Sequence, residues 1–128
     1  MENGYTQTIT GWKSYHPDFW SPSRGVASHA LRKAVNEYMQ ATAAGVVKLY
    51  MVGQDAVAQA LGGTMLLQVH DETVCEVPNT VLYEFVRESR SALADAQVLK
   101  TVPLEIRIYT GDNWGRMKEY EDVTTNNS

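Results

Sequence analysis

Two adjacent carboxylates, Asp71 and Glu72, are the residues of this 128-residue chain best suited to chemistry. They follow His70 between two short segments rich in β-forming residues, which predicts an acidic turn at the tip of a β-hairpin. Aspartate is common in solvated turns, so the spacing alone favours an ordinary turn. The alternative is a magnesium site, because Mg²⁺ is typically held by one or two carboxylates together with substrate phosphates. A two-metal reaction needs further acidic residues from another part of the protein.

A second group of polar residues lies at helical spacing. Arg32, Asn36 and Gln40 are four residues apart, so on a helix they form one ridge about 12 Å long. Most surface helices carry such a stripe, and a solvent-facing role is the simpler interpretation. The alternative is DNA contact, because all three side chains donate hydrogen bonds and every base pair offers the acceptors N3 or O2 in the minor groove. Such a ridge would hold paired DNA without selecting a sequence.

The other reactive residues form no motif. His70 is open to three roles, as a metal ligand, a base or a hydrogen-bond donor, and no second histidine lies at metal-ligand spacing. The single cysteine, Cys75, alternates with Val77 and is most simply a small core residue. One cysteine also excludes an internal disulfide and a multi-cysteine zinc site, so a reducing intracellular compartment fits best.

The secondary-structure elements that must position these residues are predicted in the order ββ–α–ββ–α–β along the chain. This order indicates an α+β fold with helices covering an antiparallel sheet. Gly45 and Gly53 are expected to break or bend the long helical region. The predicted segments are a hairpin and loop in 1–23, a helical region in 24–61, the acidic hairpin in 64–78, an amphipathic helix and a strand at 103–109 within 79–115, and a polar tail in 121–128.

Composition restricts the class of protein. With 44% hydrophobic and 20% charged residues, the chain is typical of a globular protein, and no apolar run approaches the length of a membrane span. The net charge of −4 argues by itself against a nucleic-acid binder, yet residues 1–50 carry five basic and three acidic residues. Five aromatic residues fall within the first twenty positions and suggest a surface that a partner covers. They are Tyr5, Trp12, Tyr15, Phe19 and Trp20.

Several segments resemble, in order, motifs of the family A DNA polymerases of the bacterial DNA polymerase I type. Residues 67–78, LQVHDETVCEVP, look like motif C, and residues 32–44, RKAVNEYMQATAA, are similar to the helix that precedes it. Residues 103–106 with 111–114 resemble the carboxyl-terminal strand, and residues 4–18 resemble the hairpin on the fingers side. Because several ordered motifs are more specific than one, the resemblance outweighs the simpler interpretations of the acidic turn and the polar stripe.

The resemblance implies a fold and a set of roles. Residues 1–120 would form the carboxyl-terminal part of a polymerase palm, with an antiparallel sheet, the motif C β-hairpin and covering helices. Asp71 would bind catalytic Mg²⁺, and Glu72 would lie beside the metals. The expected contacts to the primer–template minor groove and the primer end are Arg32, Asn36, Gln40 and His70. The sequence departs from the family pattern at Tyr38, Ala41 and Gly45, and Trp12-Lys13 replaces a common Arg-Arg pair.

Nothing in the sequence resembles the family's motif A, which carries the other catalytic aspartate, or the fingers helix that binds the nucleotide. We therefore expect a subunit of a split DNA-directed DNA polymerase, inactive without a second polypeptide that supplies motif A, the fingers helix and the thumb. Two Mg²⁺ ions, primer–template DNA and deoxynucleoside triphosphates would complete the site. The aromatic N-terminal region would form part of the contact with that polypeptide, and the expected location is the cytoplasm, or the host cytoplasm for a viral protein. The alternative is a non-catalytic palm remnant that binds DNA or a protein.

Overall fold

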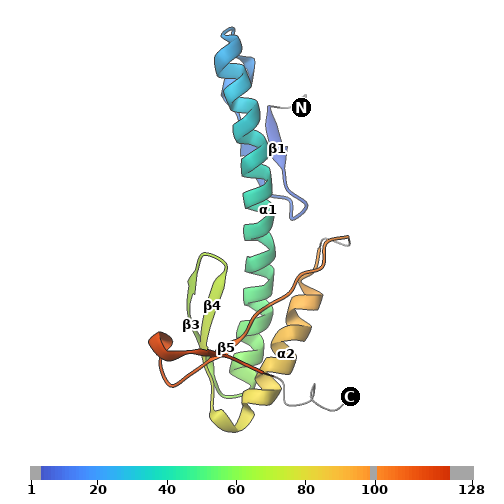
Figure 1. Ribbon diagram of the computed structural model, residues 1–128. Coiled ribbons are helices and arrows are strands. Elements are labelled where there is room, and N and C mark those ends of the chain that lie inside the picture. The colour runs from blue at the N-terminus through green and yellow to red at the C-terminus, as the bar shows by residue number, and fades with distance from the viewer. Residues whose placement is uncertain (1–3, 99–100, 122–128) are drawn as a thin grey trace.

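The computed structural model describes residues 4–98 and 101–121, and it is organised around one long helix, α1 (Arg24–Ala60). Two groups of elements pack against opposite halves of α1 (Figure 1). The N-terminal group is β1 (Tyr5–Gln7), β2 (Lys13–Tyr15) and the 3-10 turn η1 (Pro17–Trp20). The second group is β3 (Thr64–Val69), β4 (Glu72–Glu76), η2 (Asn79–Val81), α2 (Leu82–Asp95), β5 (Tyr109–Thr110), η3 (Trp114–Arg116) and β6 (Lys118–Glu119).

Helix α1 buries a single narrow stripe along its 37 residues. The buried side chains are Ala30, Ala34, Thr42, Val46, Tyr50, Gln54 and Ala58, at intervals of four or eight residues. Because four residues are slightly more than one helical turn, these side chains form a narrow row that winds slowly around α1, and the rest of α1 is left to solvent or to other molecules. The helix ends in a Schellman motif at Gly62, whose φ is +75°. There the Gly63 N–H donates to the Ala58 carbonyl at 2.8 Å and the Gly62 N–H donates to the Gln59 carbonyl at 3.1 Å.

The expected break at Gly45 and Gly53 is wrong, because α1 is continuous through both. Each glycine instead lies where another element approaches the helix. A Cβ on Gly45 would lie 2.6 Å from the hydroxyl of Thr10 in the β1–β2 turn. A Cβ on Gly53 would lie 3.1 Å from the Cβ of Ala92 in α2. The cost of glycine in a helix, about 1 kcal/mol each, is therefore offset by close packing at these two contacts.

The α+β class is confirmed, but the described residues form three separate two-stranded antiparallel sheets and not one. The pairs are β1–β2, β3–β4 and β5–β6. The predicted strand at 103–109 is only partly correct. Residues 104–109 alternate between half-buried and exposed as predicted, yet the ladder begins at Tyr109. Alternation reports which side chains face the protein, whereas a ladder needs a neighbouring strand, and the described chain places none beside 104–107.

The hydrophobic core is small and lies between the second half of α1, α2 and residue Ile106. The apolar face predicted for α2 is confirmed: Phe85, Val86 and Ala96 are buried, and Leu82 and Leu93 are half-buried. Many large apolar side chains on α1 and β3 remain exposed, including Val35, Met39, Leu49, Val52 and Leu66. The predicted polar tail at 121–128 lies outside the described residues except for Glu121.

Candidate functional site

The tip of the β3–β4 hairpin fixes the acidic pair. Val69 and Glu72 are the last paired residues, so only His70 and Asp71 form the turn. His70 has φ +56°, a left-handed conformation that is uncommon for a residue with a side chain. The side-chain amide of Gln68 donates a hydrogen bond to the His70 carbonyl and holds the turn. A short, braced turn of this kind aims the Asp71 carboxylate in a defined direction.

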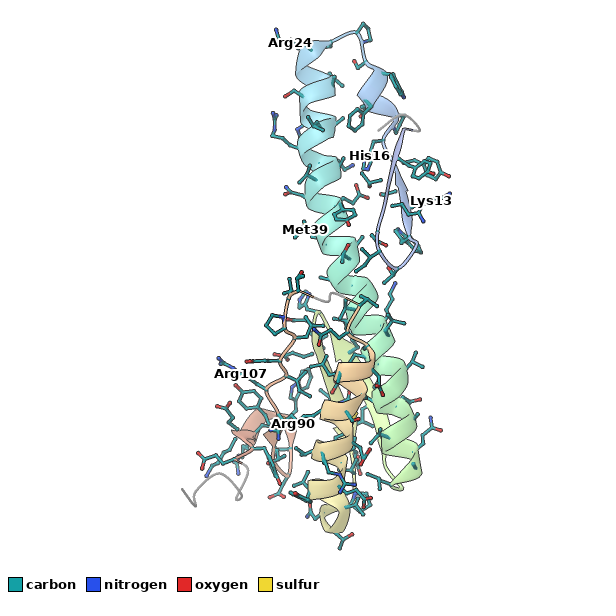
Figure 2. The ribbon with its side chains drawn as sticks, turned by 90° about the vertical axis from the view of Figure 1, so that its right-hand side faces the viewer. Lys13, His16, Arg24, Met39, Arg90 and Arg107 are labelled. Carbon is teal, nitrogen blue, oxygen red and sulfur yellow. The ribbon has the colours of Figure 1, made fainter. Side chains whose placement is uncertain are left out.

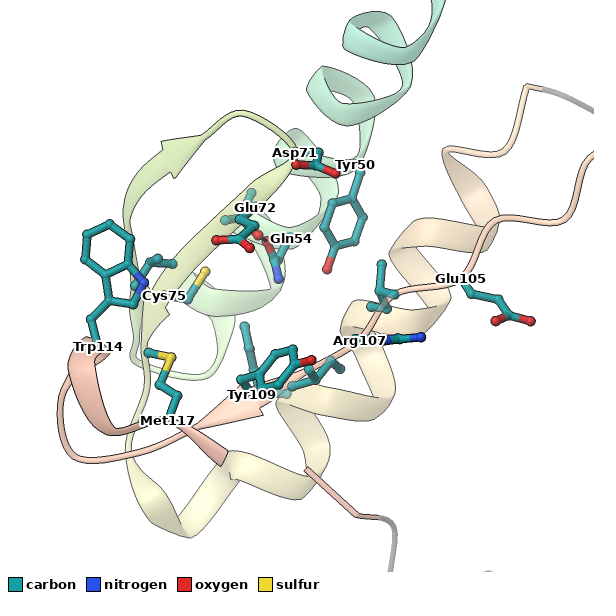
Figure 3. Close-up of a pocket in the computed structure, with 15 residues that line it drawn as sticks. Tyr50, Gln54, Asp71, Glu72, Cys75, Glu105, Arg107, Tyr109, Trp114 and Met117 are labelled. Atoms are coloured by element: carbon teal, nitrogen blue, oxygen red, sulfur yellow. Dashed lines mark hydrogen bonds between the residues drawn. The ribbon is translucent and has the colours of Figure 1, made fainter. Parts of the chain in front are cut away.

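Asp71 and Glu72 line a cavity of about 610 Å³ between β4 and residues 105–109 (Figure 3). Both side chains are exposed, and neither makes an ion pair or hydrogen bond within the described part of the chain. Tyr50, Gln54 and Phe85 also line the cavity, from α1 and α2. The two carboxylates are therefore free to bind a cation or another charged ligand that enters this space.

The side chains beneath the acidic pair are held in place and uncharged. Gln54 is buried, and its Oε1 accepts a hydrogen bond of 2.5 Å from Thr73 Oγ1, which ties α1 to β4. Burial raises the pKa of Tyr50 to about 12, with a smaller contribution from Cys75. Burial also raises the pKa of Cys75 to about 11, with a smaller contribution from Asp55. The Cys75 thiol thus stays protonated at neutral pH and is no activated nucleophile.

Two backbone edges face the same cavity. β4 pairs with β3 on one side, and no described strand pairs with its other edge. Residues 104–107, on the far side of the cavity, are extended and make no backbone hydrogen bond to any described residue. Unpaired backbone N–H and C=O groups at an edge can accept an additional strand.

The carboxylates of Asp71 and Glu72 are ligands of the type that magnesium prefers, but two carboxylates alone make a small ligand set. Asp71 and Glu72 offer carboxylate oxygens, which Mg²⁺ prefers, from a turn that is accessible to solvent. Residues 4–98 and 101–121 contain no cluster of three or more His, Cys, Asp or Glu residues that could hold a metal ion. The two carboxylates fit a magnesium ion that also takes ligands from substrate phosphates or from another segment.

The polar ridge predicted on the long helix lies on α1, at the expected residues. Arg32, Asn36 and Gln40 are all exposed and line a shallow groove of about 540 Å³. Arg32 Nη1 donates to Ser28 Oγ at 2.9 Å, one turn away on the same helix. The structure does not bring the ridge and the acidic turn into contact, but the β3–β4 hairpin points along α1 toward the ridge (Figure 1). Gln40 precedes Tyr50 of the cavity by ten residues, about 15 Å along the helix axis.

The sequence analysis missed the residues that line the cavity opposite and beneath the carboxylates. Tyr50 and Gln54 could have been identified from the sequence, because both belong to the row of buried positions spaced four residues apart on α1. A glutamine in such a row indicates a polar side chain with a hydrogen-bond partner. Tyr109, Trp114 and Arg107 reach the cavity through the course of the chain after α2, which no local pattern reports. No helix in the described ranges is both long and apolar enough to cross a membrane.

An acidic hairpin beside a long helix with a polar ridge suits an enzyme that acts on nucleic acid. The family model for DNA polymerase family A matches residues 1–116, and the chain belongs to this family. The sequence is 36% identical over 116 residues to the thermostable DNA polymerase I of Thermus aquaticus, covering 91% of this chain and 14% of that protein. It is 37% identical over 112 residues to DNA polymerase I of Deinococcus radiodurans, covering 88% of this chain and 12% of that protein.

A solved structure agrees with these matches. The POL domain of Pol1 from M. smegmatis, in complex with DNA primer–template and dNTP, superposes with a TM-score of 0.67 at 34% identity. The match covers 74% of this chain and 17% of that chain. The resemblance to family A is thereby confirmed, together with the α+β architecture of a partial palm. The chain spans only 12 to 14% of the length of these curated relatives.

Proposed function

We propose that this chain is a subunit of a split DNA-directed DNA polymerase and supplies the motif C carboxylates and a helix that contacts the primer–template. The observation that carries the proposal is the β3–β4 turn of a family A chain. Its two exposed carboxylates make no ion pair with any described residue and lie at the edge of a large cavity. The cavity beside these carboxylates gives a magnesium ion and a triphosphate a place to bind, which a turn that faces open solvent does not offer.

The proposed reaction joins the primer 3′-hydroxyl oxygen to the α-phosphorus of a nucleoside triphosphate and releases pyrophosphate. Asp71 would hold magnesium at the turn, and Glu72 would lie beside it. Bound magnesium supplies positive charge that neutralises the triphosphate and polarises its phosphoryl oxygens. The exposure of both carboxylates leaves room for the triphosphate, and the neutral Tyr50 beneath them adds no competing charge.

Helix α1 provides the proposed DNA contact. Arg32, Asn36 and Gln40 are exposed on a helix that is continuous over 37 residues, so their relative positions are fixed. Their donors match the acceptors that all base pairs present in the minor groove, which suits an enzyme that copies any sequence. His70, at the tip that points toward this ridge, is proposed to contact the primer end.

A second polypeptide is proposed to complete the enzyme. It would supply motif A, the fingers helix and the thumb. Uncovered apolar side chains support this: the exposed fractions are 64% for Met39, 74% for Val52 and 54% for Leu66. Apolar groups so exposed usually mark an interaction surface. The unpaired edges of β4 and residues 104–107 leave a place where a strand carrying a further carboxylate would complete the sheet and the metal site.

Reconstitution tests the split arrangement. The tagged chain is expressed in its native cell, and the proteins that purify with it are identified and produced separately. We expect primer extension from the assembled pair and none from the highly purified chain alone. Extension by the chain alone would contradict the need for a partner.

The non-catalytic palm remnant is kept as a second candidate because the described residues hold no third metal-ligating side chain beside Asp71 and Glu72. The same experiment separates the two functions. A complex that binds primer–template DNA but incorporates no nucleotide at saturating Mg²⁺ would favour the remnant.

A further inference from the structure

The β3–β4 hairpin is anchored to the rest of the protein by limited apolar packing. Every side chain of β3 and β4 is exposed or only half-buried, and Leu66, Leu67 and Val69 are exposed. Figure 2 shows from the side that the hairpin runs along the second half of α1 and ends short of Met39. Because close packing is what fixes one arrangement of neighbouring elements, packing alone leaves the position of this hairpin and its turn weakly specified.

A hydrogen bond between side chains supplies the missing direction. Thr73 Oγ1 of β4 donates to Gln54 Oε1 of α1 at 2.5 Å. Within residues 4–98 and 101–121, no other hydrogen bond and no ion pair joins β3, β4 or their turn to α1. Gln54 is only 7% exposed, so water competes little for this bond, and a hydrogen bond in such surroundings is stronger than one in water.

The register of the hairpin carries this bond to the acidic turn. Thr73 is paired with Gln68 of β3, and the Gln68 side chain donates to the carbonyl of His70. The two carboxylate residues lie between His70 and Thr73 in the chain. Their backbone is thus held at both ends, and among the described residues Gln54 alone ties it to α1 by a hydrogen bond.

A glutamine at this buried position has a cost that an apolar side chain would not have. Gln54 lies in the row of buried side chains on α1, between Tyr50 and Ala58. Burying an amide is unfavourable unless the amide is hydrogen-bonded, whereas a methionine would fill the same space by packing alone. The amide adds direction, because Oε1 accepts a hydrogen bond only from a donor at a suitable distance and angle. The bond therefore favours one position of β4 over the others that packing would permit.

We infer that Gln54 is a positioning residue, whose hydrogen bond with Thr73 fixes the acidic turn relative to α1 and therefore relative to the polar ridge on the same helix. Gln54 follows Gln40 of the ridge by 14 residues, about 21 Å along a helix that is continuous between them. The helix thus sets the distance from the ridge to the anchor, and the anchor sets the turn. The catalytic consequence rests on the proposed function, in which Asp71 must meet a metal ion while the ridge holds the primer–template.

The first test is structural and uses the full chain without metal, nucleotide or partner. Gln54→Met keeps the length of the side chain and removes the acceptor. Gln59→Met is the matched control, because it removes an amide hydrogen bond of 2.7 Å to Asp55 within the same helix. Amide hydrogen exchange, followed by NMR, should become about fivefold faster in β3 and β4 of Gln54→Met, the factor that one ordinary hydrogen bond corresponds to, and stay unchanged in α2. Gln59→Met should leave the hairpin at the wild-type rates.

The second test is single-turnover incorporation by the assembled enzyme. Gln54→Met should lower the rate at saturating primer–template and nucleotide by at least about tenfold, because a misplaced carboxylate no longer meets the reacting groups. The affinity for primer–template should not change, since the ridge stays in place. Thr73→Val, which removes the donor, should have the same effect, and Thr73→Ser, which keeps the hydroxyl, should incorporate near the wild-type rate. The double variant Gln54→Met/Thr73→Val should be no slower than either single variant, because both changes break one bond.

Three results would overturn the inference. Hairpin exchange in Gln54→Met at the wild-type rate would show that the bond does not anchor the hairpin, and equal acceleration in α2 would show a general loss of stability. The third is wild-type incorporation by Gln54→Met in an enzyme that Asp71→Asn inactivates. An enzyme that Asp71→Asn leaves fully active would refute the proposed function instead, and the exchange of the hairpin amides would still decide whether Gln54 positions the turn.

Discussion

Replacing Asp71 by asparagine is the most direct test of the acidic turn. The substitution keeps the size and shape of the side chain and removes one negative charge from the edge of the cavity. Asp71 is exposed and makes no ion pair with any described residue, so the free energy of unfolding should change by less than about 0.5 kcal/mol. A change in activity would then report the charge and not a folding defect.

The expected size of the effect follows from the position of the carboxylate. Two opposite unit charges in contact attract by about 1 kcal/mol in bulk water and by about 4 kcal/mol near a protein surface. Asp71 borders a cavity lined in part by buried groups, so the surface value applies. A loss of about 4 kcal/mol of transition-state stabilisation lowers the rate by roughly 10³-fold. Glu72→Gln should be milder, because Glu72 is proposed to lie beside the metal and not to hold it.

The assay is single-turnover incorporation by the assembled enzyme at saturating primer–template, nucleotide and Mg²⁺. Saturation separates the chemical step from binding. Asp95→Asn, which removes an exposed carboxylate at the end of α2, is the control and should incorporate at the wild-type rate. An Asp71→Asn enzyme that incorporates near the wild-type rate would refute the metal role and return the hairpin to an ordinary acidic turn.

Three further outcomes are expected. Gln40→Ala should weaken primer–template affinity to a similar degree on several DNA sequences at one salt concentration, whereas a strong change in sequence preference would contradict the minor-groove contact. Gly45→Ala should lower the free energy of unfolding in urea by about 1–3 kcal/mol because its Cβ would collide with the β1–β2 turn. Gly25→Ala on the same helix, where a Cβ would meet only Ser23 Oγ at 4.0 Å, should raise it by up to about 1 kcal/mol. Alkylation of Cys75 by iodoacetamide should accelerate about tenfold per pH unit up to about pH 10, because only the thiolate reacts and its pKa is raised to about 11; a rate that levels off near pH 8.5 would show an unshifted thiol.

Local sequence patterns correctly predicted the elements whose formation depends mainly on residues close together in the chain. The helical region expected in 24–61 predicted α1, and β-forming residues on both sides of His70 predicted the β3–β4 hairpin. Gly45 and Gly53 were misread because the same residue type weakens an isolated helix and permits a close contact in a packed one. Only the neighbouring element decides which effect prevails.

The site could be predicted in part for the same reason. Asp71 and Glu72 are adjacent in sequence, and the ridge of α1 follows a helical repeat, so both were found from spacing. The cavity was not, because Tyr109 and Trp114 reach it from a segment whose course depends on tertiary packing. The strand expected at 103–109 shows the limit of alternation, which specifies a buried face but no hydrogen-bonding partner.

The division of α1 between two groups of elements has a consequence for how the protein unfolds. Among the described elements, the β1–β2 hairpin and η1 each contact α1 but make no packing contact with α2, β3 or β4. Within the described elements the two ends are therefore joined through α1 alone, and we expect each end to unfold as a separate cooperative unit, or foldon. Amide hydrogen exchange should be faster in the first half of α1, where the buried side chains Ala30 and Ala34 are small, than near the larger buried Tyr50. A ligand that holds the hairpin against α1 would slow exchange along the polar ridge of α1 without touching it, so that ordering at one surface lowers the entropic cost of binding at the next.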